Sequence, residues 1–133
     1  MPITTWSHPM WFVIHNWSFG YPIEPLESDR RVTADYYNNL PNLIPCAECA
    51  THFEQILQSD PVEANLDNRG DLVEWTWRIH NAVNSRIGKP TFSMDAFCDK
   101  YGIQVQDDQP VAPIMSRAIG KLTQTVYGIL YRV

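Results

Sequence analysis

The sequence predicts an all-α fold, and two observations favour it. Strand signals are scarce, because sustained alternation of apolar and polar residues is rare and no Asn-Gly or Asp-Gly pair lies between apolar runs. Apolar residues instead recur at three-to-four spacing in segments separated by proline and glycine. The 133 residues, 44% of them hydrophobic, suffice for one domain with one core. We expect four main helices, a short fifth helix and a C-terminal amphipathic helix.

Capping and helix-breaking residues delimit the first two helices. Ser7 can cap the first, whose early turn accepts Pro9, and the chain breaks at Gly20. Ser28 or Asp29 opens the second. The expected apolar side of this second helix consists of Val32, Tyr36, Leu40 and Leu43.

The third helix is expected over 45–59, beginning at Pro45, and the fourth from Asp71 to a stop at Gly88. Ser93 can cap the short fifth helix, which reaches Tyr101. We therefore divide the chain into a helical bundle (1–103), an acidic, proline-containing linker (104–113) and a C-terminal helical extension (114–133).

Charge is distributed unevenly along the chain. The formal net charge is −5, so no basic surface favours nucleic acid. Residues 110–133 contain Arg117, Lys121 and Arg132 but no acidic residue. We expect this extension to pack on the bundle or extend a dimer; alternatively, it is a surface helix that binds an anionic membrane or a partner.

Targeting signals are not visible in the sequence. The first residues lack a basic start and a long apolar run, so no signal peptide is expected. No stretch of about 20 apolar residues occurs, so no membrane span is expected. The localisation stays open on these grounds.

Cys46 and Cys49 lie three residues apart at the start of the expected third helix. At this spacing the two sulfurs can form a bridge or separate as thiols with little change in the backbone. The unpaired N–H groups and partial positive charge of a helix N-terminus stabilise a thiolate, which both attacks and leaves in thiol–disulfide exchange. Glu48 opposes this effect slightly. We interpret the pair as redox-active.

Two other interpretations of this pair remain open. The cysteines could form an inert bridge in a non-enzymatic helical interaction module, although a bridge across so small a loop restricts the unfolded chain little. They could also bind a metal with His52, although structural zinc takes four ligands. The remaining cysteine, Cys98, is expected to be a buried or idle thiol, with a bridge between subunits as the alternative.

A polar stripe marks the expected fourth helix. His80 and Asn84 are four residues apart and share one helix face, which Asn81 and Trp77 flank. A single histidine on such a face is commonly a core residue. Together with two asparagines, a tryptophan and the following Lys89, it makes a pocket for a planar ligand as much favoured as a core role.

Both features belong to a longer pattern that runs from about Trp6 to Tyr101. Its segments are Trp11-Phe12-Val13-Ile14-His15, Tyr21-Pro22, Pro45-Cys46-Ala47-Glu48-Cys49-Ala50-Thr51-His52-Phe53, Trp77-Arg78-Ile79-His80-Asn81-Ala82-Val83-Asn84 and Ile87-Gly88-Lys89-Pro90-Thr91-Phe92. In order and spacing, these segments resemble the Erv/ALR family of FAD-linked sulfhydryl oxidases.

The resemblance implies a four-helix bundle that holds FAD at one end, with a short fifth helix. It implies catalytic roles for Cys46 and Cys49 and no metal. It implies FAD binding by Trp11, His15, Trp77, His80, Asn81, Val83, Asn84, Ile87, Lys89, Lys100 and Tyr101. Electrons from protein thiols would pass through the cysteine pair and the flavin to O2, giving H2O2. Cys46 would meet the substrate, and Cys49 would lie beside the flavin.

Many members of this family carry a second, shuttle cysteine pair, which this sequence lacks. We therefore expect a protein thiol substrate, or a separate thiol-redox relay protein, to meet Cys46 directly. With a single cysteine pair, the sequence resembles the viral branches of the family. A viral origin would place the protein in the host cytoplasm or the virion. The family also implies a homodimer, to which Tyr36 and Tyr37 could contribute.

Overall fold

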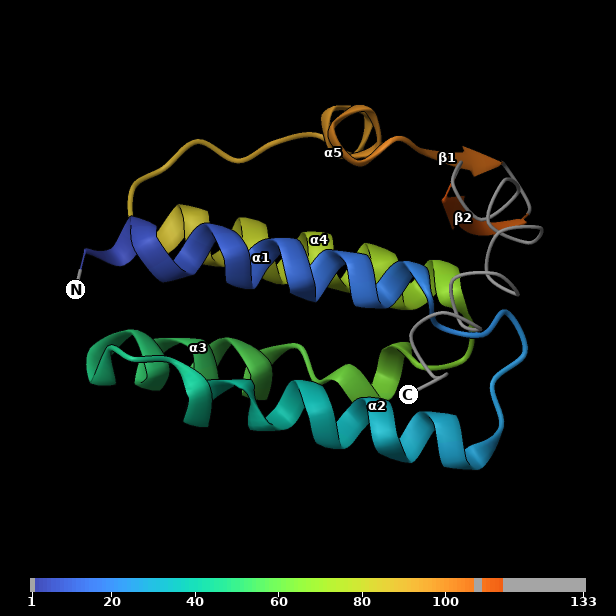
Figure 1. Cartoon of the computed structure of the whole chain (residues 1–133), viewed down its shortest axis with the longest axis horizontal. Helices are drawn as coiled ribbons and strands as arrows, with labels where there is room; N and C mark the ends of the chain where they lie inside the picture. Colours follow the sequence, from blue (N-terminus) through green and yellow to red (C-terminus); the bar gives the residue numbers. More distant parts are fainter. Residues whose placement is uncertain (1, 107–108, 114–133) are drawn as a thin grey trace, which may run out of the picture.

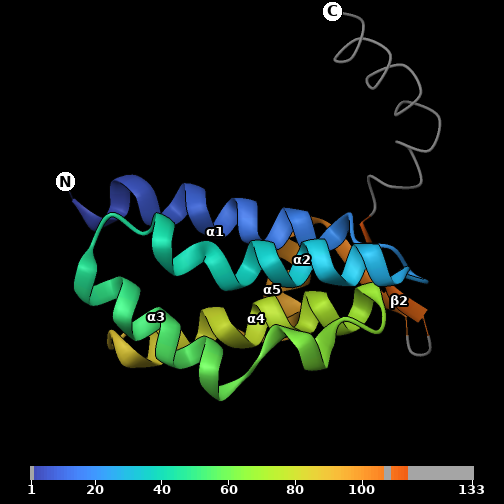
Figure 2. The ribbon, with the colours of Figure 1, turned by 90° about the horizontal axis from the view of Figure 1, so that it is seen from below.

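The computed structural model describes residues 2–106 and 109–113. Four helices run roughly along a common direction: α1 (Ile3–Phe19), α2 (Glu27–Asn39), α3 (Ala47–Ser59) and α4 (Arg69–Arg86). Figure 1 shows α1 beside α4 in one layer and α2 with α3 in the other, and Figure 2 shows the same bundle turned by 90°. The all-α prediction is confirmed for this bundle.

Two short 3₁₀ segments, η1 (Leu40–Leu43) and η2 (Val62–Asn65), complete the bundle. The fifth helix, α5 (Met94–Tyr101), crosses above the α1–α4 layer and is seen almost end-on in Figure 1. Ser93 caps α5 by accepting a hydrogen bond from the Ala96 N–H, as the sequence predicts. Among the described residues, no helix has the length and apolar character needed to cross a membrane.

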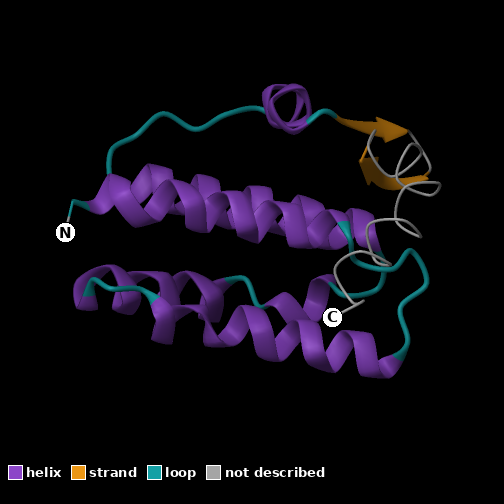
Figure 3. Ribbon diagram, in the orientation of Figure 1, coloured by secondary structure: helices purple, strands orange, loops and turns teal. Residues whose placement is uncertain are grey.

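A short antiparallel hairpin follows α5, which the sequence pattern did not indicate (Figure 3). It consists of β1 (Ile103–Gln106) and β2 (Gln109–Pro113), with Ile103 opposite Pro113. Gly102 turns the chain at the end of α5 with a φ of 63°, a conformation that favours glycine. Apart from Ile103, the residues of the two strands fall in the segment expected as a linker, 104–113. The expected C-terminal helix, 114–133, lies outside the described residues.

The core forms two separate clusters of buried side chains. The main core lies inside the four-helix bundle and includes the fully buried Trp75, Leu72 and Ile79 of α4. The smaller core joins α5 and the hairpin to the bundle and consists of Phe19, Val73, Phe97 and Ile103. The helices α1 and α4 contribute to both clusters, so they connect the two parts of the core.

The expected apolar side of the second helix is partly wrong. Val32 and Leu43 are 65% and 71% exposed, whereas Tyr37 and Leu40 are buried. The α-helix ends at Asn39 and continues as the 3₁₀ segment η1, so the helical period changes before Leu43. The Tyr37 hydroxyl donates to the Ile14 carbonyl at 2.9 Å, which fixes the face that α2 buries.

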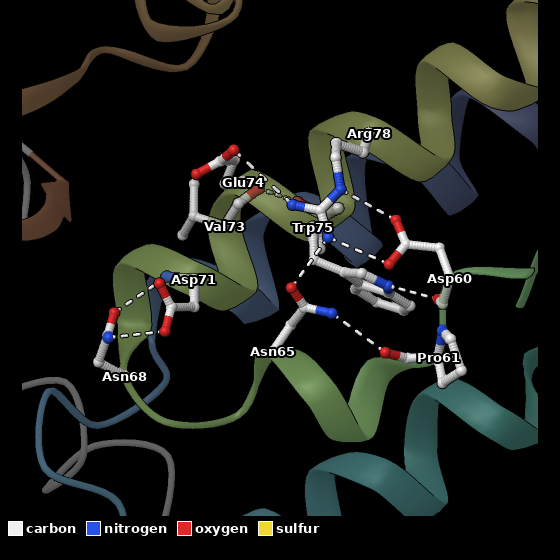
Figure 4. Close-up of polar contacts among 10 residues, drawn as sticks. Asp60, Pro61, Asn65, Asn68, Asp71, Val73, Glu74, Trp75 and Arg78 are labelled. Atoms are coloured by element: carbon white, nitrogen blue, oxygen red, sulfur yellow. Dashed lines mark hydrogen bonds and ion pairs between the residues drawn. The ribbon is translucent and has the colours of Figure 1, made fainter.

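Polar contacts attach α4 to the loop that precedes it (Figure 4). Arg78 donates two hydrogen bonds to the Asp60 carboxylate, at 2.9 and 3.1 Å, and a third to Asn65 at 2.9 Å. The Trp75 indole N–H donates to the Asp60 carbonyl at 2.8 Å. Because Asp60 is the C-cap of α3, these bonds fix α3, which carries the cysteine pair at its start, relative to α4.

Asn68 caps α4 by accepting from the Asp71 N–H at 2.9 Å (Figure 4). The helix therefore begins at Arg69, two residues before the Asp71 start that the sequence predicts. Asp71 acts in the first turn, where its carboxylate accepts from the Asn68 side chain and lies at the positive end of the helix dipole.

Candidate active site

Cys46 and Cys49 form a disulfide at the N-terminus of α3. Cys46 is the N-cap residue, and its Sγ accepts from the Cys49 N–H at 3.3 Å. Both cysteines are half-buried. Because the pair lies at the start of α3, the unpaired N–H groups of the first turn and the helix dipole stabilise negative charge on either sulfur when the disulfide opens.

A cavity of about 350 Å³ lies beside this disulfide. Residues of α1, α3 and α4 line it, and Cys49 lies in its wall while Cys46 does not. Seven of the residues predicted for catalysis or FAD binding meet there: Trp11, Cys49, His80, Val83, Asn84, Ile87 and Lys89. The structure thus brings together the cysteine pair and most of the polar stripe, which are distant in sequence.

His15 lies directly behind the cavity wall. It is fully buried, and its Nε2 is 2.8 Å from Nδ1 of His80. Trp11 stacks on the His80 ring with a centroid distance of 3.9 Å and an interplanar angle of 3°. Both residues line the cavity, so this aromatic stack forms part of its wall, and such a wall suits a planar ligand.

Both imidazoles are held in their neutral form. Burial, with smaller contributions from the charges of His80 and Lys100, lowers the pKa of His15 to about 3. Burial, followed by the charges of Lys100, Lys89 and His8, lowers the pKa of His80 to about 4. A neutral pair can donate and accept hydrogen bonds without placing a charge against the cavity.

Asn81 and Trp77, both predicted to bind FAD, contact protein backbone instead of lining the cavity. The Asn81 amide donates to the Phe92 carbonyl at 2.9 Å and accepts from the Phe92 N–H at 3.1 Å. The Trp77 indole N–H also donates to this carbonyl, at 3.0 Å. The two side chains therefore hold the segment that leads from α4 to α5 against α4.

Lys100 and Tyr101 lie on α5 and also do not line the cavity. The Tyr101 ring is 5.2 Å from the His15 ring, and Lys100 Nζ is 5.6 Å from the Tyr101 ring centroid. Tyr101 is half-buried, whereas Lys100 is exposed. Their predicted contacts with FAD stay predictions.

Replacing Asn81 with leucine is expected to lower the free energy of unfolding by about 1–3 kcal/mol, since Phe92 would lose two hydrogen bonds. The Phe92 amide should also exchange its hydrogen faster. Chemical denaturation and amide hydrogen exchange measure the two effects. Ala82→Ser, at an exposed neighbouring position, is the control. Unchanged protection of the Phe92 amide in Asn81→Leu would show that the Asn81 side chain does not hold the Phe92 backbone.

Several lining residues were not predicted, among them His8, His52, Phe53 and Arg86. A helical signal could have found His52 and Phe53, because they follow Cys49 by three and four residues and so share its face of α3. Arg86 and Lys89 are exposed at the C-terminal end of α4 and give one edge of the cavity positive charge.

Gly88 shapes this edge. Its φ of 74° would strain any other L-residue, and it turns the chain so that the Lys89 N–H donates to the Asn84 carbonyl at 2.8 Å.

Among the described residues, no group of three or more His, Cys, Asp or Glu side chains is placed to hold a metal ion. The site therefore combines a disulfide, a flat aromatic surface and a basic edge.

The family model described as the Erv1 / Alr family matches residues 8–102. The chain belongs to this family. The match contains most of α1 and all of α2 to α5, together with the disulfide. The resemblance inferred from the sequence is thereby confirmed.

Curated relatives of this Erv1/Alr member come from plants, fungi and viruses. A rice protein named FAD-linked sulfhydryl oxidase ERV1 is 32% identical over 92 residues, which are 69% of this chain and 46% of that protein. A protein of African swine fever virus named FAD-linked sulfhydryl oxidase is 25% identical over 96 residues, which are 72% of this chain and 79% of that protein. The chain spans about half the length of the plant relatives it matches.

Solved structures support the same fold. The yeast Erv1 core is similar with a TM-score of 0.69 and 22% identity, over 75% of this chain and 83% of that one. The FAD binding domain of Erv1 from Saccharomyces cerevisiae has the same TM-score with 23% identity, over 75% of this chain and 93% of that one. The helical bundle seen here is therefore the fold of this family.

Proposed function

We propose that this Erv1/Alr member is an FAD-dependent sulfhydryl oxidase that forms disulfides in protein thiols and passes the electrons to O2, giving H2O2. One observation carries the proposal: the disulfide at the N-terminus of α3 adjoins, through Cys49, a cavity with a flat aromatic surface. Curated relatives named FAD-linked sulfhydryl oxidases support it. A non-enzymatic module with an inert bridge is not favoured, because it leaves the cavity beside the bridge unexplained.

The lining of the cavity fits a flavin dinucleotide. Trp11, Phe53 and Val83 provide aromatic and apolar surface for the planar ring, and Asn84 adds a buried amide. Arg86 and Lys89 suit the charge of a diphosphate. FAD bound here would supply a two-electron acceptor beside Cys49 that O2 can reoxidise.

The protein residues have distinct tasks in this reaction. A substrate thiolate attacks Cys46, which lies outside the cavity wall, and forms a mixed disulfide while Cys49 leaves as a thiolate. The N-terminus of α3 stabilises that thiolate. A second substrate thiol then displaces Cys46, so the substrate gains one disulfide and loses two electrons and two protons. The reduced pair then holds the two electrons, with the Cys49 thiol in the cavity wall.

The proposal is tested by flavin binding. Protein purified and incubated with FAD should retain it after gel filtration and absorb blue light, and should consume O2 when a dithiol is added. A colourless protein that consumes no O2 would overturn the proposal. Purified protein that contains one bound zinc ion per chain would instead favour a metal site at the cysteine pair.

We also propose a homodimer formed through α1 and α2. Val13, Trp17 and Val32 are exposed on these helices, and the Trp17 and Tyr36 rings meet with a centroid distance of 4.1 Å. Such an exposed apolar surface is typical of an interface. Light scattering should give twice the 15.4 kDa mass of one chain, and a monomer at micromolar concentration would contradict the dimer. Tyr37 is buried inside the protomer and does not contribute.

A further inference from the structure

A chain of four hydrogen-bonding groups connects the backbone of α4 to the cavity. The Thr76 hydroxyl donates to the Val73 carbonyl at 2.8 Å. Nδ1 of His15 lies 3.0 Å from the same hydroxyl oxygen, and Nε2 of His15 lies 2.8 Å from Nδ1 of His80. His15 and Thr76 are both fully buried, so no water competes for these groups.

The direction of each hydrogen bond follows from the first. A hydroxyl has one proton, and Thr76 gives it to the carbonyl three residues earlier, as helical threonines commonly do. Its oxygen must therefore accept from His15, so the proton of neutral His15 lies on Nδ1. Nε2 of His15 is then an acceptor, and Nδ1 of His80 must donate to it.

We propose that Thr76 and His15 are positioning residues that fix the tautomer of His80, leaving its Nε2 as a bare hydrogen-bond acceptor for an N–H donor of a planar heteroaromatic ligand in the cavity. Trp11 stacked on one face fixes the plane of the same ring, and His80 lines the cavity. Among the described residues, none hydrogen-bonds Nε2 of His80, so this nitrogen is left for the ligand.

The ligand part of this inference rests on the proposed flavin function, whereas the tautomer does not. An isoalloxazine ring and an adenine ring both carry N–H donors, so either end of FAD could be recognised in this way. The neutral state of both histidines, which burial enforces by lowering each pKa, keeps the arrangement intact at neutral pH.

Long-range ¹H–¹⁵N NMR of the histidine rings tests the tautomers directly, because protonated and bare imidazole nitrogens resonate far apart. In the free protein, both His15 and His80 should carry the proton on Nδ1. A proton on Nε2 of either ring would overturn the proposal. This measurement needs no variant and no cofactor.

Two variants of Thr76 test its part in the chain. Thr76→Val keeps the shape but removes the oxygen that accepts from His15, so both rings should move toward the Nε2–H tautomer. Thr76→Ser retains the hydroxyl and should keep the wild-type spectrum. Unchanged tautomers in a folded Thr76→Val protein would show that Thr76 does not set them. If that variant does not fold, the wild-type spectrum still decides the proposal.

Ligand titrations test the acceptor. Adding FAD should move the His80 Nε2 signal toward the protonated position, and Thr76→Val should weaken FAD binding by about 3- to 10-fold, as expected for one lost hydrogen bond. FMN and ADP, added separately, show which end of FAD is responsible. Bound FAD without a change at Nε2 would overturn the acceptor role. Failure to bind FAD would overturn the proposed function and leave the tautomers standing.

Discussion

Replacing Cys49 with serine is expected to reduce dithiol-driven O2 consumption to the uncatalysed rate, while FAD remains bound. Serine keeps the size of the side chain but cannot form the disulfide that accepts substrate electrons. The cavity wall is otherwise unchanged, so retention of FAD should persist. An oxygen electrode and a visible spectrum of the same sample measure the two properties.

Two companion variants sharpen this prediction. Cys46→Ser should also stop turnover, but it leaves the Cys49 thiol in the cavity wall, so the visible spectrum of bound FAD should differ from that of Cys49→Ser. Cys98→Ser is the matched control, because Cys98 is free in the structure and lies on α5. Turnover that persists in Cys49→Ser would show that the roles assigned to the pair are wrong.

Acidification from pH 7.5 to pH 5 is expected to lower the free energy of unfolding by on the order of 3 kcal/mol. His15 and His80 have pKa values lowered to about 3 and about 4 in the folded protein. In the unfolded chain each returns to about 6.5, so below this pH the unfolded state binds more protons than the folded state. Stability is therefore present above pH 6.5 and declines as the pH falls toward 4.

Urea denaturation at several pH values measures this effect. His15→Gln removes one of the two titrating groups, so its stability should fall less steeply between pH 7.5 and pH 5, whatever its stability at neutral pH. Equal free energies of unfolding at pH 7.5 and pH 5 in the wild type would contradict the burial of two neutral histidines.

The sequence predicted the existence of the bundle helices because local signals mark them, but the expected cap at Ser7 is wrong, since α1 begins at Ile3 and Ser7 lies inside it. Ser93 caps α5 as expected, and Gly88 ends the turn after α4 as expected. Leu43 was misplaced because a change from α to 3₁₀ geometry at Leu40 alters the helical period, whereas Val32 lies on the exposed side of the regular helix. The hairpin was missed because its strands are too short for a clear alternation to emerge.

The site was partly predictable because some of its residues follow the helical period. Periodicity places His80, Val83 and Asn84 on one helix face, and the structure places all three in the cavity wall. It cannot show that the Asn81 amide is paired with the Phe92 backbone, because that contact depends on the path of a loop. The His15–Thr76 contact joins residues 61 positions apart, so only the folded chain reveals it.

The division of the buried side chains into two clusters has a consequence for how the domain opens locally. Because α5 and the hairpin are joined to the bundle through the smaller cluster, we expect their local opening to cost less free energy than global unfolding. This opening would uncover the aromatic residues behind the cavity while the disulfide and the main core keep their places. The cavity beside the disulfide, which residues of α1, α3 and α4 line, would keep its wall during such an opening.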